Sequence, residues 1–257
     1  MPYRPRIGLT MRLELETRRF YLGRDYSEAI EAAGGLPVHI PLIAEAGYIR
    51  DVVAGLDGFL LPGSDTDVDP VRYSEQPHPA LKKVVPEKDE TDALVLEEAE
   101  RRNVPVLAIC YGMQALNVAR GGSLIQDLAA AGYETVKHEQ GPPLARSSHS
   151  IAIEPGSLIA SIAKGESARV NSHHHQAISR VGRDLVATAW AHDQVIEAVE
   201  DTRDDRFVLG VQWHPELSWN RDELSREIFI RFVSECARRV EVSSGLKAET
   251  ERGLPVM

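Results

Sequence analysis

The feature that most constrains the fold is a short apolar run, Val106 to Ile109, that ends in Cys110. Gly112 and an amphipathic stretch follow it directly, so the segment predicts a buried strand, a tight turn and a helix. Such a turn holds the thiol beside the unpaired N–H groups of the helix, which favour a thiolate and can stabilise an oxyanion. The small Gly112 suits the strained turn of a nucleophile elbow. Taken by itself, Cys110 favours a structural role, because free cysteine is among the most buried residue types.

A second strand signal, residues 207–213, favours the catalytic interpretation. It ends in His214, Pro215 and Glu216. In an extended chain His214 and Glu216 project to the same side, and Pro215 marks the end of the strand. A cysteine, a histidine and a carboxylate that orients the histidine are the components of an activated thiol nucleophile. We therefore expect Cys110, His214 and Glu216 to meet in a catalytic site.

Strand and helix signals alternate along the first half of the chain, which is typical of a parallel α/β sheet. The predicted strands there are 7–10, 38–40, 58–61 and 106–109, and the predicted helices are 24–33, 44–54 and 91–102. Short alternating runs at 149–153, 184–189, 194–199 and 207–213 predict antiparallel additions, and 222–239 predicts a closing helix. We expect residues 1–241 to form a single domain, and the polar, aperiodic residues 242–257 to form a mobile C-terminal tail.

These motifs resemble a known superfamily. Cys110-Tyr111-Gly112-Met113-Gln114 with His214-Pro215-Glu216 is similar to the class I glutamine amidotransferases, which use a Cys-His-Glu triad. The segments Leu61-Pro62-Gly63-Ser64-Asp65, Gly121-Gly122-Ser123-Leu124 and Asn171-Ser172-His173-His174-His175-Gln176 resemble its peptidase C26 branch, which contains γ-glutamyl-γ-aminobutyrate hydrolase. The resemblance covers residues 5 to 240. It implies a flavodoxin-like sandwich, a mostly parallel sheet flanked by helices, and a hydrolase that needs no cofactor.

The resemblance also implies roles for residues around the predicted nucleophile. The N–H of Tyr111, at the start of the helix, is one natural oxyanion donor, and the family adds the backbone of Gly63. Gln114 lies one helical turn beyond Cys110, where relatives hold the γ-amide region of the substrate. The loop that contains His174 and His175 is placed at the rim of the site, in contact with substrate.

Two clusters in the sequence invite a metal-binding interpretation that their own patterns argue against. Asp65, Asp67 and Asp69 alternate as in an EF-hand loop, but that loop requires Gly and Glu where Pro70 and Gln76 stand. A loop closed by Asx turns is the better interpretation. The consecutive residues 173–175 are all histidine, yet three successive side chains in an extended segment point apart. We therefore expect no metal site.

Composition limits the partners. The formal net charge of −10 argues against binding to a nucleic-acid backbone or an anionic membrane. Neither an apolar signal-peptide core nor an apolar run of about 18 residues is present, and two distant cysteines suit a reducing compartment, so we expect a cytoplasmic protein. Cys236 lies in the last helical stretch and is expected to pack there. Both a monomer and a homo-oligomer are compatible with the sequence.

Two functions fit the motifs. The first is a free-standing hydrolase that cleaves a small γ-glutamyl amide and releases the amine. The second is a glutaminase subunit that supplies ammonia to a separate synthetase, which the elbow Ile109-Cys110-Tyr111-Gly112-Met113-Gln114 favours because it is close to the glutaminase part of GMP synthetase. The Pro-Gly-Ser-Asp loop and the histidine-rich loop favour the first. The chain has no GxxxxGK[ST] fingerprint, so a synthetase would be a separate polypeptide.

Overall fold

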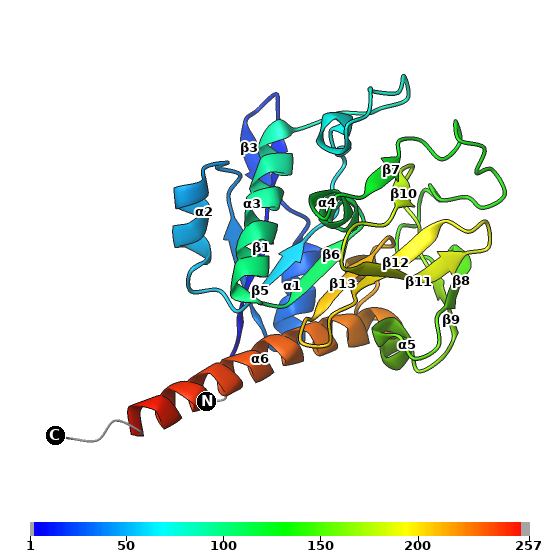
Figure 1. Cartoon of the computed structure of the whole chain (residues 1–257). Coiled ribbons are helices and arrows are strands. Elements are labelled where there is room, and N and C mark those ends of the chain that lie inside the picture. Colours follow the sequence, from blue (N-terminus) through cyan, green and yellow to red (C-terminus); the bar gives the residue numbers. More distant parts are fainter. Residues whose placement is uncertain (1–2, 253–257) are drawn as a thin grey trace.

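One large sheet organises the molecule, as a computed structural model shows it for residues 3–252, with side chains described to residue 240. Its strands are β1 Arg6–Thr10, β4 Leu36–Ile40, β5 Gly58–Leu61, β6 Val106–Ile109, β8 His149–Ile153, β9 Ser167–Val170, β11 Leu185–Ala191, β12 Ile196–Asp201 and β13 Val208–Val211. They lie in the order β4-β1-β5-β6-β13-β12-β11-β8-β9 (Figure 1). The pairs from β4 to β13 are parallel, and those from β13 to β9 are antiparallel. The predicted α/β fold with antiparallel additions is confirmed.

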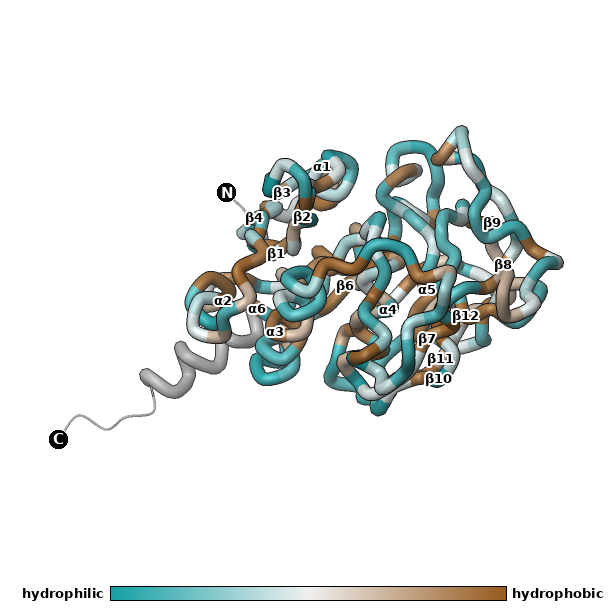
Figure 2. Tube along the Cα trace, turned by 90° about the horizontal axis from the view of Figure 1, so that it is seen from above, coloured by the Kyte–Doolittle hydropathy of each residue, from teal (hydrophilic) through white to brown (hydrophobic). Residues whose placement is uncertain are grey.

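Helices cover both faces of the sheet. They are α1 Arg24–Ala32, α2 Ala46–Val53, α3 Pro86–Arg102, α4 Tyr111–Ala119, α5 Leu158–Ala163 and α6 Glu223–Arg252, with short 3-10 turns η1 Pro70–Tyr73 and η2 Pro215–Leu217. Alternate strand residues point to opposite faces. Thus Leu107 and Ile109 join the core under α1, α5 and α6, whereas Val106 and Ala108 join the core under α2, α3 and α4. Figure 2 shows the resulting apolar interior between polar outer segments. None of the helices, as far as the structure describes them, is long and apolar enough to cross a membrane.

Some elements differ from the sequence-based expectations. Helix α3 begins at Pro86, earlier than the predicted residue 91, because proline is well suited to the first helical position. Two small sheets were missed, one made by β2 Arg12–Glu14 with β3 Arg19–Tyr21 and one by β7 Ser123–Ile125 with β10 Ala177–Arg180. Helix α6 continues to Arg252, into the segment expected to be a tail. The remainder of that expectation, residues 253–257, lies outside the described residues.

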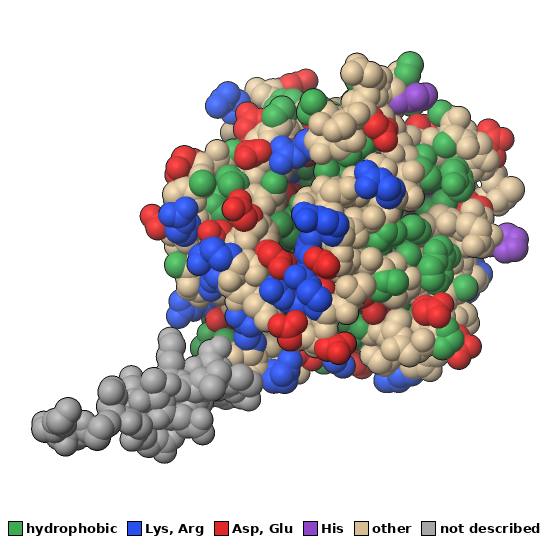
Figure 3. Space-filling view, in the orientation of Figure 1, with side chains coloured by type: hydrophobic (Ala, Val, Ile, Leu, Met, Phe, Trp, Pro, Cys, Tyr) green, Lys and Arg blue, Asp and Glu red, His purple; other side chains and the backbone are tan. Residues whose placement is uncertain are grey.

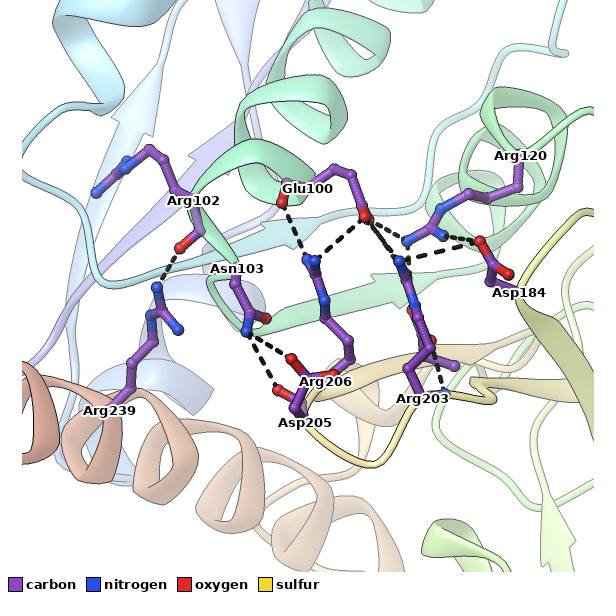
Figure 4. A network of polar contacts seen from close by, with 10 residues as sticks. Glu100, Arg102, Asn103, Arg120, Asp184, Arg203, Asp205, Arg206 and Arg239 are labelled. Atoms are coloured by element: carbon purple, nitrogen blue, oxygen red, sulfur yellow. Dashed lines mark hydrogen bonds and ion pairs between the residues drawn. The ribbon is translucent and has the colours of Figure 1, made fainter.

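A charged network joins elements at the amino ends of β6 and β13. Basic and acidic side chains lie side by side on this face (Figure 3). Near the C-terminus of α3, the carboxylate of Glu100 lies 2.6 Å from Arg120, 2.8 Å from Arg203 and 3.4 Å from Arg206 (Figure 4). A cavity of about 720 Å³ opens beside this network, and none of the predicted site residues lines it. Cys110 and His214 instead follow β6 and β13 at the opposite, carboxyl edge of the sheet, where ligands of open α/β sheets bind.

Candidate active site

Cys110 lies at the sharp turn that the sequence predicts. It follows β6 and precedes α4, with φ 52° and ψ −108°, a conformation that L-residues rarely adopt. Its side chain is 5% exposed. Gly112 is required beside it, because a Cβ at that position would collide with the carbonyl group of Leu61. The elbow therefore packs directly against the end of β5.

His214 follows the neighbouring strand β13, and two neighbours fix its position. Its Nδ1 lies 2.6 Å from Oε1 of Glu216. The side-chain amide of Asn171 donates to the carbonyl of His214 and accepts its N–H, each at 2.8 Å. Burial acts to lower the pKa of His214, but the charges of Glu216 and Cys110 outweigh it and raise the pKa to about 10. Glu216 thus orients the imidazole, and the raised pKa keeps it protonated beside Cys110 at neutral pH.

Gly63 lies against the histidine ring. A Cβ there would come within 2.7 Å of Cε1 of His214, so only glycine fits. Its N–H is not free, because it donates to the hydroxyl of Tyr26 at 3.0 Å, and its carbonyl accepts from Nε of Arg12 at 2.7 Å. Burial raises the pKa of Tyr26 well above its ordinary value, and the charge of Glu216 adds to this effect. The hydroxyl beside the Gly63 amide therefore stays protonated.

The other elbow residues have more internal roles than the sequence suggests. As the first residue of α4, Tyr111 has no acceptor for its N–H within the helix. Its buried hydroxyl makes a short hydrogen bond with Asp89. The side chain of Gln114 is 3% exposed, and its amide nitrogen donates to the carbonyl of Gln176 and to the side chain of Gln212. Gln114 therefore ties α4 to two other segments, and a contact with substrate stays a prediction.

The three consecutive histidines diverge. The ring of His173 lies 5.8 Å from that of His214, and its Nε2 lies 2.9 Å from the carbonyl of Leu144. His174 points the other way, into the protein, and is 4% exposed. His175 bridges two carboxylates, Asp67 and Asp127. Of this loop, then, it is His173 that approaches the catalytic histidine, whereas the sequence singled out His174 and His175.

Sequence reasoning assigned no role to the residues that support Gly63 and His214. Arg12, on β2, and Tyr26, on α1, hold the Gly63 loop, and Asn171 brackets the backbone of His214. The sequence position of Arg12 could have indicated its role. It follows the carboxyl end of β1, which lies at the same edge of the sheet as the elbow. Tyr26 reads as one apolar position of an amphipathic helix, and nothing in the sequence distinguishes it.

Comparison with known proteins identifies the family of this chain. The family model for peptidase C26 matches residues 6–216. The chain belongs to the peptidase C26 family. It is 35% identical over 229 residues to the γ-glutamyl-γ-aminobutyrate hydrolase PuuD of Escherichia coli K12, covering 85% of this chain and 87% of the relative. It is 36% identical over 219 residues to protein NtpR of Enterococcus hirae, covering 84% and 89%.

The fold also matches a solved structure. A GMP synthase subunit of Thermoplasma acidophilum superposes with a TM-score of 0.65, covering 95% of this chain and 100% of that one. At 17% identity this likeness shows the fold alone, that of the class I glutamine amidotransferases. Family and relatives together make this chain a glutamine amidotransferase-like hydrolase.

Proposed function

We propose that this member of the peptidase C26 family cleaves γ-glutamyl amide bonds, such as that of γ-glutamyl-γ-aminobutyrate, through a γ-glutamyl thioester. The observation that carries the proposal is the arrangement of the elbow thiol, His214 and Glu216 at neighbouring strand ends. The relative PuuD, named for hydrolysis of γ-glutamyl-γ-aminobutyrate, supports the substrate class. The leaving amine is γ-aminobutyrate or a similar amine or peptide.

The chemistry follows from the positions of the three side chains. With His214 protonated at Nε2, Cys110 attacks the γ-carbonyl carbon as the thiolate of an ion pair. His214 then protonates the amine nitrogen, the C–N bond breaks and the amine departs. The γ-glutamyl group remains bound to Cys110 as a thioester. A water molecule gives a proton back to His214 and attacks the thioester; the C–S bond breaks, the γ-glutamyl group leaves as glutamate, and the thiolate–imidazolium pair is restored. Glu216 keeps the imidazole in the tautomer that places the reactive nitrogen toward the sulfur.

Two backbone donors are positioned to stabilise the oxyanion. The N–H of Tyr111 is free of helical bonding and lies beside the reacting sulfur. The N–H of Gly63 becomes available when the substrate oxygen replaces the Tyr26 hydroxyl as its acceptor. Each such donor contributes about 3 kcal/mol to lowering the barrier. Arg12 fixes the Gly63 carbonyl, so this peptide is held in orientation while the acceptor changes.

The test is a panel of γ-glutamyl compounds, including glutamine, assayed with the purified protein alone. We expect hydrolysis of at least one γ-glutamyl amine without ATP or a second protein, and no thioester or product with Cys110→Ala. Glutamine hydrolysis that appears only with a synthetase partner would instead support the ammonia-supplying function. Inertness toward every compound, with a thiol that reacts normally with iodoacetamide, would contradict the free-standing hydrolase.

A further inference from the structure

A second cluster of titratable groups lies in the antiparallel half of the sheet. His138, His174 and Glu197 are all buried, at 4%, 4% and 0% exposure. One ligating atom from each lies within 4.8 Å of the other two. They come from three separate segments: the loop before β8, the loop after β9, and β12. A shared occupant would therefore tie these segments together.

The distances in this cluster are too long for hydrogen bonds. Nδ1 of His138 lies 3.5 Å from Oε1 of Glu197, and Nε2 of His174 lies 3.7 Å from the same atom. Ligand atoms held about 2.1 Å from one tetrahedral metal ion are separated by about 3.4 Å. Among the described residues, His138 Nδ1, His174 Nε2 and Glu197 Oε2 have no hydrogen-bond partner. Buried polar atoms without partners are rare and costly, so the cluster needs either a proton shared between the histidines and Glu197 or a bound cation.

The surrounding groups leave the inward-facing nitrogens free to bind a metal. Nε2 of His138 lies 3.0 Å from a carboxylate oxygen of Asp193. Nδ1 of His174 lies 2.9 Å from the carbonyl of Gln176. In each neutral ring the outer nitrogen can donate its proton to that acceptor, and the inner nitrogen then keeps its lone pair. Burial acts to lower the pKa of His138, but Glu197 and Asp193 outweigh it and raise the pKa, so a metal ion has to displace a proton there and should be held less tightly as the pH falls. Histidines that bind metal ions are held by such carboxylate or carbonyl acceptors.

The carboxylate of Glu197 has a similar support. Nε2 of His149, on β8, lies 3.0 Å from Oε1 of Glu197. This contact is a normal hydrogen bond, so His149 orients the carboxylate while Oε2 remains unpartnered. A set of two imidazoles and one carboxylate suits zinc and other late divalent transition metals better than magnesium or calcium.

We propose that His138 Nδ1, His174 Nε2 and the carboxylate of Glu197 form a buried structural site for a divalent transition metal such as Zn²⁺. This site corrects the expectation of no metal, because its three residues are more than 20 positions apart along the chain and form no local motif. The occupied site would fix the loop that continues from Asn171, whose side chain brackets His214. Its role is to hold this wall of the molecule in place, and no step of hydrolysis passes through the ion.

The binding test uses untagged protein carrying Cys110→Ser, because a thiolate beside His214 could bind zinc by itself. The protein is stripped with a chelator, incubated with Zn²⁺, desalted and analysed for metal by mass spectrometry. We expect one zinc per chain and, at a free Zn²⁺ concentration 100-fold above Kd, a Tm increase of about 5–10 °C. These measurements do not depend on activity, so their outcome is separate from that of the proposed hydrolysis.

Variants then locate the bound ion. His174→Gln and His138→Gln should each abolish retention of zinc and the metal-dependent increase in Tm. His192→Gln, an exposed histidine close to Asp193, is the matched control and should behave as the parent. If His174→Gln does not fold, as judged by circular dichroism, His138→Gln decides the question.

Two results would overturn the proposal. One is a parent protein that keeps no zinc and whose Tm is unchanged by Zn²⁺; protons shared between the histidines and Glu197 would then occupy the cluster. The other is a folded His138→Gln variant that keeps the same zinc content and the same Tm increase, because the ion would then lie elsewhere.

Discussion

The two cysteines of this chain are both buried, yet they have opposite surroundings. Cys110 lies at the carboxyl edge of the sheet, in a rare backbone conformation, at the start of a helix and beside an ionisable histidine. Cys236 lies in the middle of α6, is fully buried among apolar side chains, and packs against Gly58 at the amino end of β5. Burial raises the pKa of Cys236 well above its ordinary value.

The comparison shows that burial alone does not determine what a thiol can do. Both side chains are 5% exposed or less, so solvent exposure cannot separate them. What separates them is the position of each along its element and the charge of the nearest groups. A thiol at a strand end meets helix N–H groups and His214, whereas a thiol on the apolar face of a helix meets only packing partners.

The largest expected effect is on turnover. Cys110→Ala should lower kcat for γ-glutamyl amide hydrolysis by a factor on the order of 10⁴–10⁶, since it removes the atom that forms the thioester. Steady-state assays of the folded variant measure this loss. Cys236→Ala is the matched control and should stay within about twofold of wild type. Activity retained by Cys110→Ala would mean that Cys110, like Cys236, is not the nucleophile.

The two partners of the reactive thiol, His214 and Glu216, should contribute unequally to turnover. His214→Ala removes the proton carrier, whereas Glu216→Gln removes only the group that orients it. We expect Glu216→Gln to retain about 10- to 100-fold more turnover than His214→Ala. The reverse order, in variants with native circular dichroism, would assign the base to another histidine, of which His173 lies beside the ring of His214.

The alkaline limb of the pH profile tests the charge of Glu216. Because the pKa of His214 is raised to about 10, its protonated form should persist to that pH and activity should fall only above it. Glu216→Gln removes a charge that raises this pKa, so the limb should move to lower pH by about 1–3 units. The profile of kcat/KM against pH for both proteins measures the shift; an unmoved limb would mean that the limb belongs to another group.

Alkylation compares the two thiols within one molecule. Iodoacetamide at neutral pH should modify Cys110 about 30-fold faster or more than Cys236, because only the former has helix N–H groups and an imidazolium to stabilise a thiolate. Peptide mass spectrometry over a time course gives both rates from one sample. Equal rates in the native protein, with both rising together in urea, would show that the elbow does not activate its thiol.

The smallest effect concerns stability. A Cβ at Gly58 would collide with the sulfur of Cys236, so Gly58→Ala should lower the free energy of unfolding by about 1–3 kcal/mol without changing turnover per folded molecule. Adding Cys236→Ala should recover part of this loss, because it removes the colliding atom. A double-mutant cycle in urea measures the coupling, and strict additivity would contradict a steric role for Cys236.

The sequence predicted the parallel half of the sheet well because apolar runs, glycine stops and amphipathic helices alternate there. The β2–β3 hairpin was missed although residues 11–16 alternate between apolar and polar side chains, because each of its strands is only three residues long and none of their residues is fully buried. The elbow and the His-Pro-Glu terminus were predictable for a physical reason: each lies at the end of an apolar run, and such ends meet at one edge of a parallel sheet.

Other parts of the site depend on contacts that no local pattern encodes. His138 and Glu197 meet only because the antiparallel strands fold back on one another, and their spacing along the chain matches no metal-binding motif. The hydrogen bond from the Gly63 amide to Tyr26 likewise depends on how α1 packs against the sheet. The directions of the three consecutive histidines were predicted to diverge, but which of them approaches His214 required the fold.

The close contact of Gly112 with Leu61 has a mechanical consequence. Because the start of α4 rests on the last residue of β5, a shift of the elbow should be transmitted to the Gly63 loop, which follows that strand. Residues 126–148, which reach the site through the contact of Leu144 with His173, have almost no regular structure. We therefore expect that loop to adapt to leaving amines of different length, while the thiol and the oxyanion donors keep their positions.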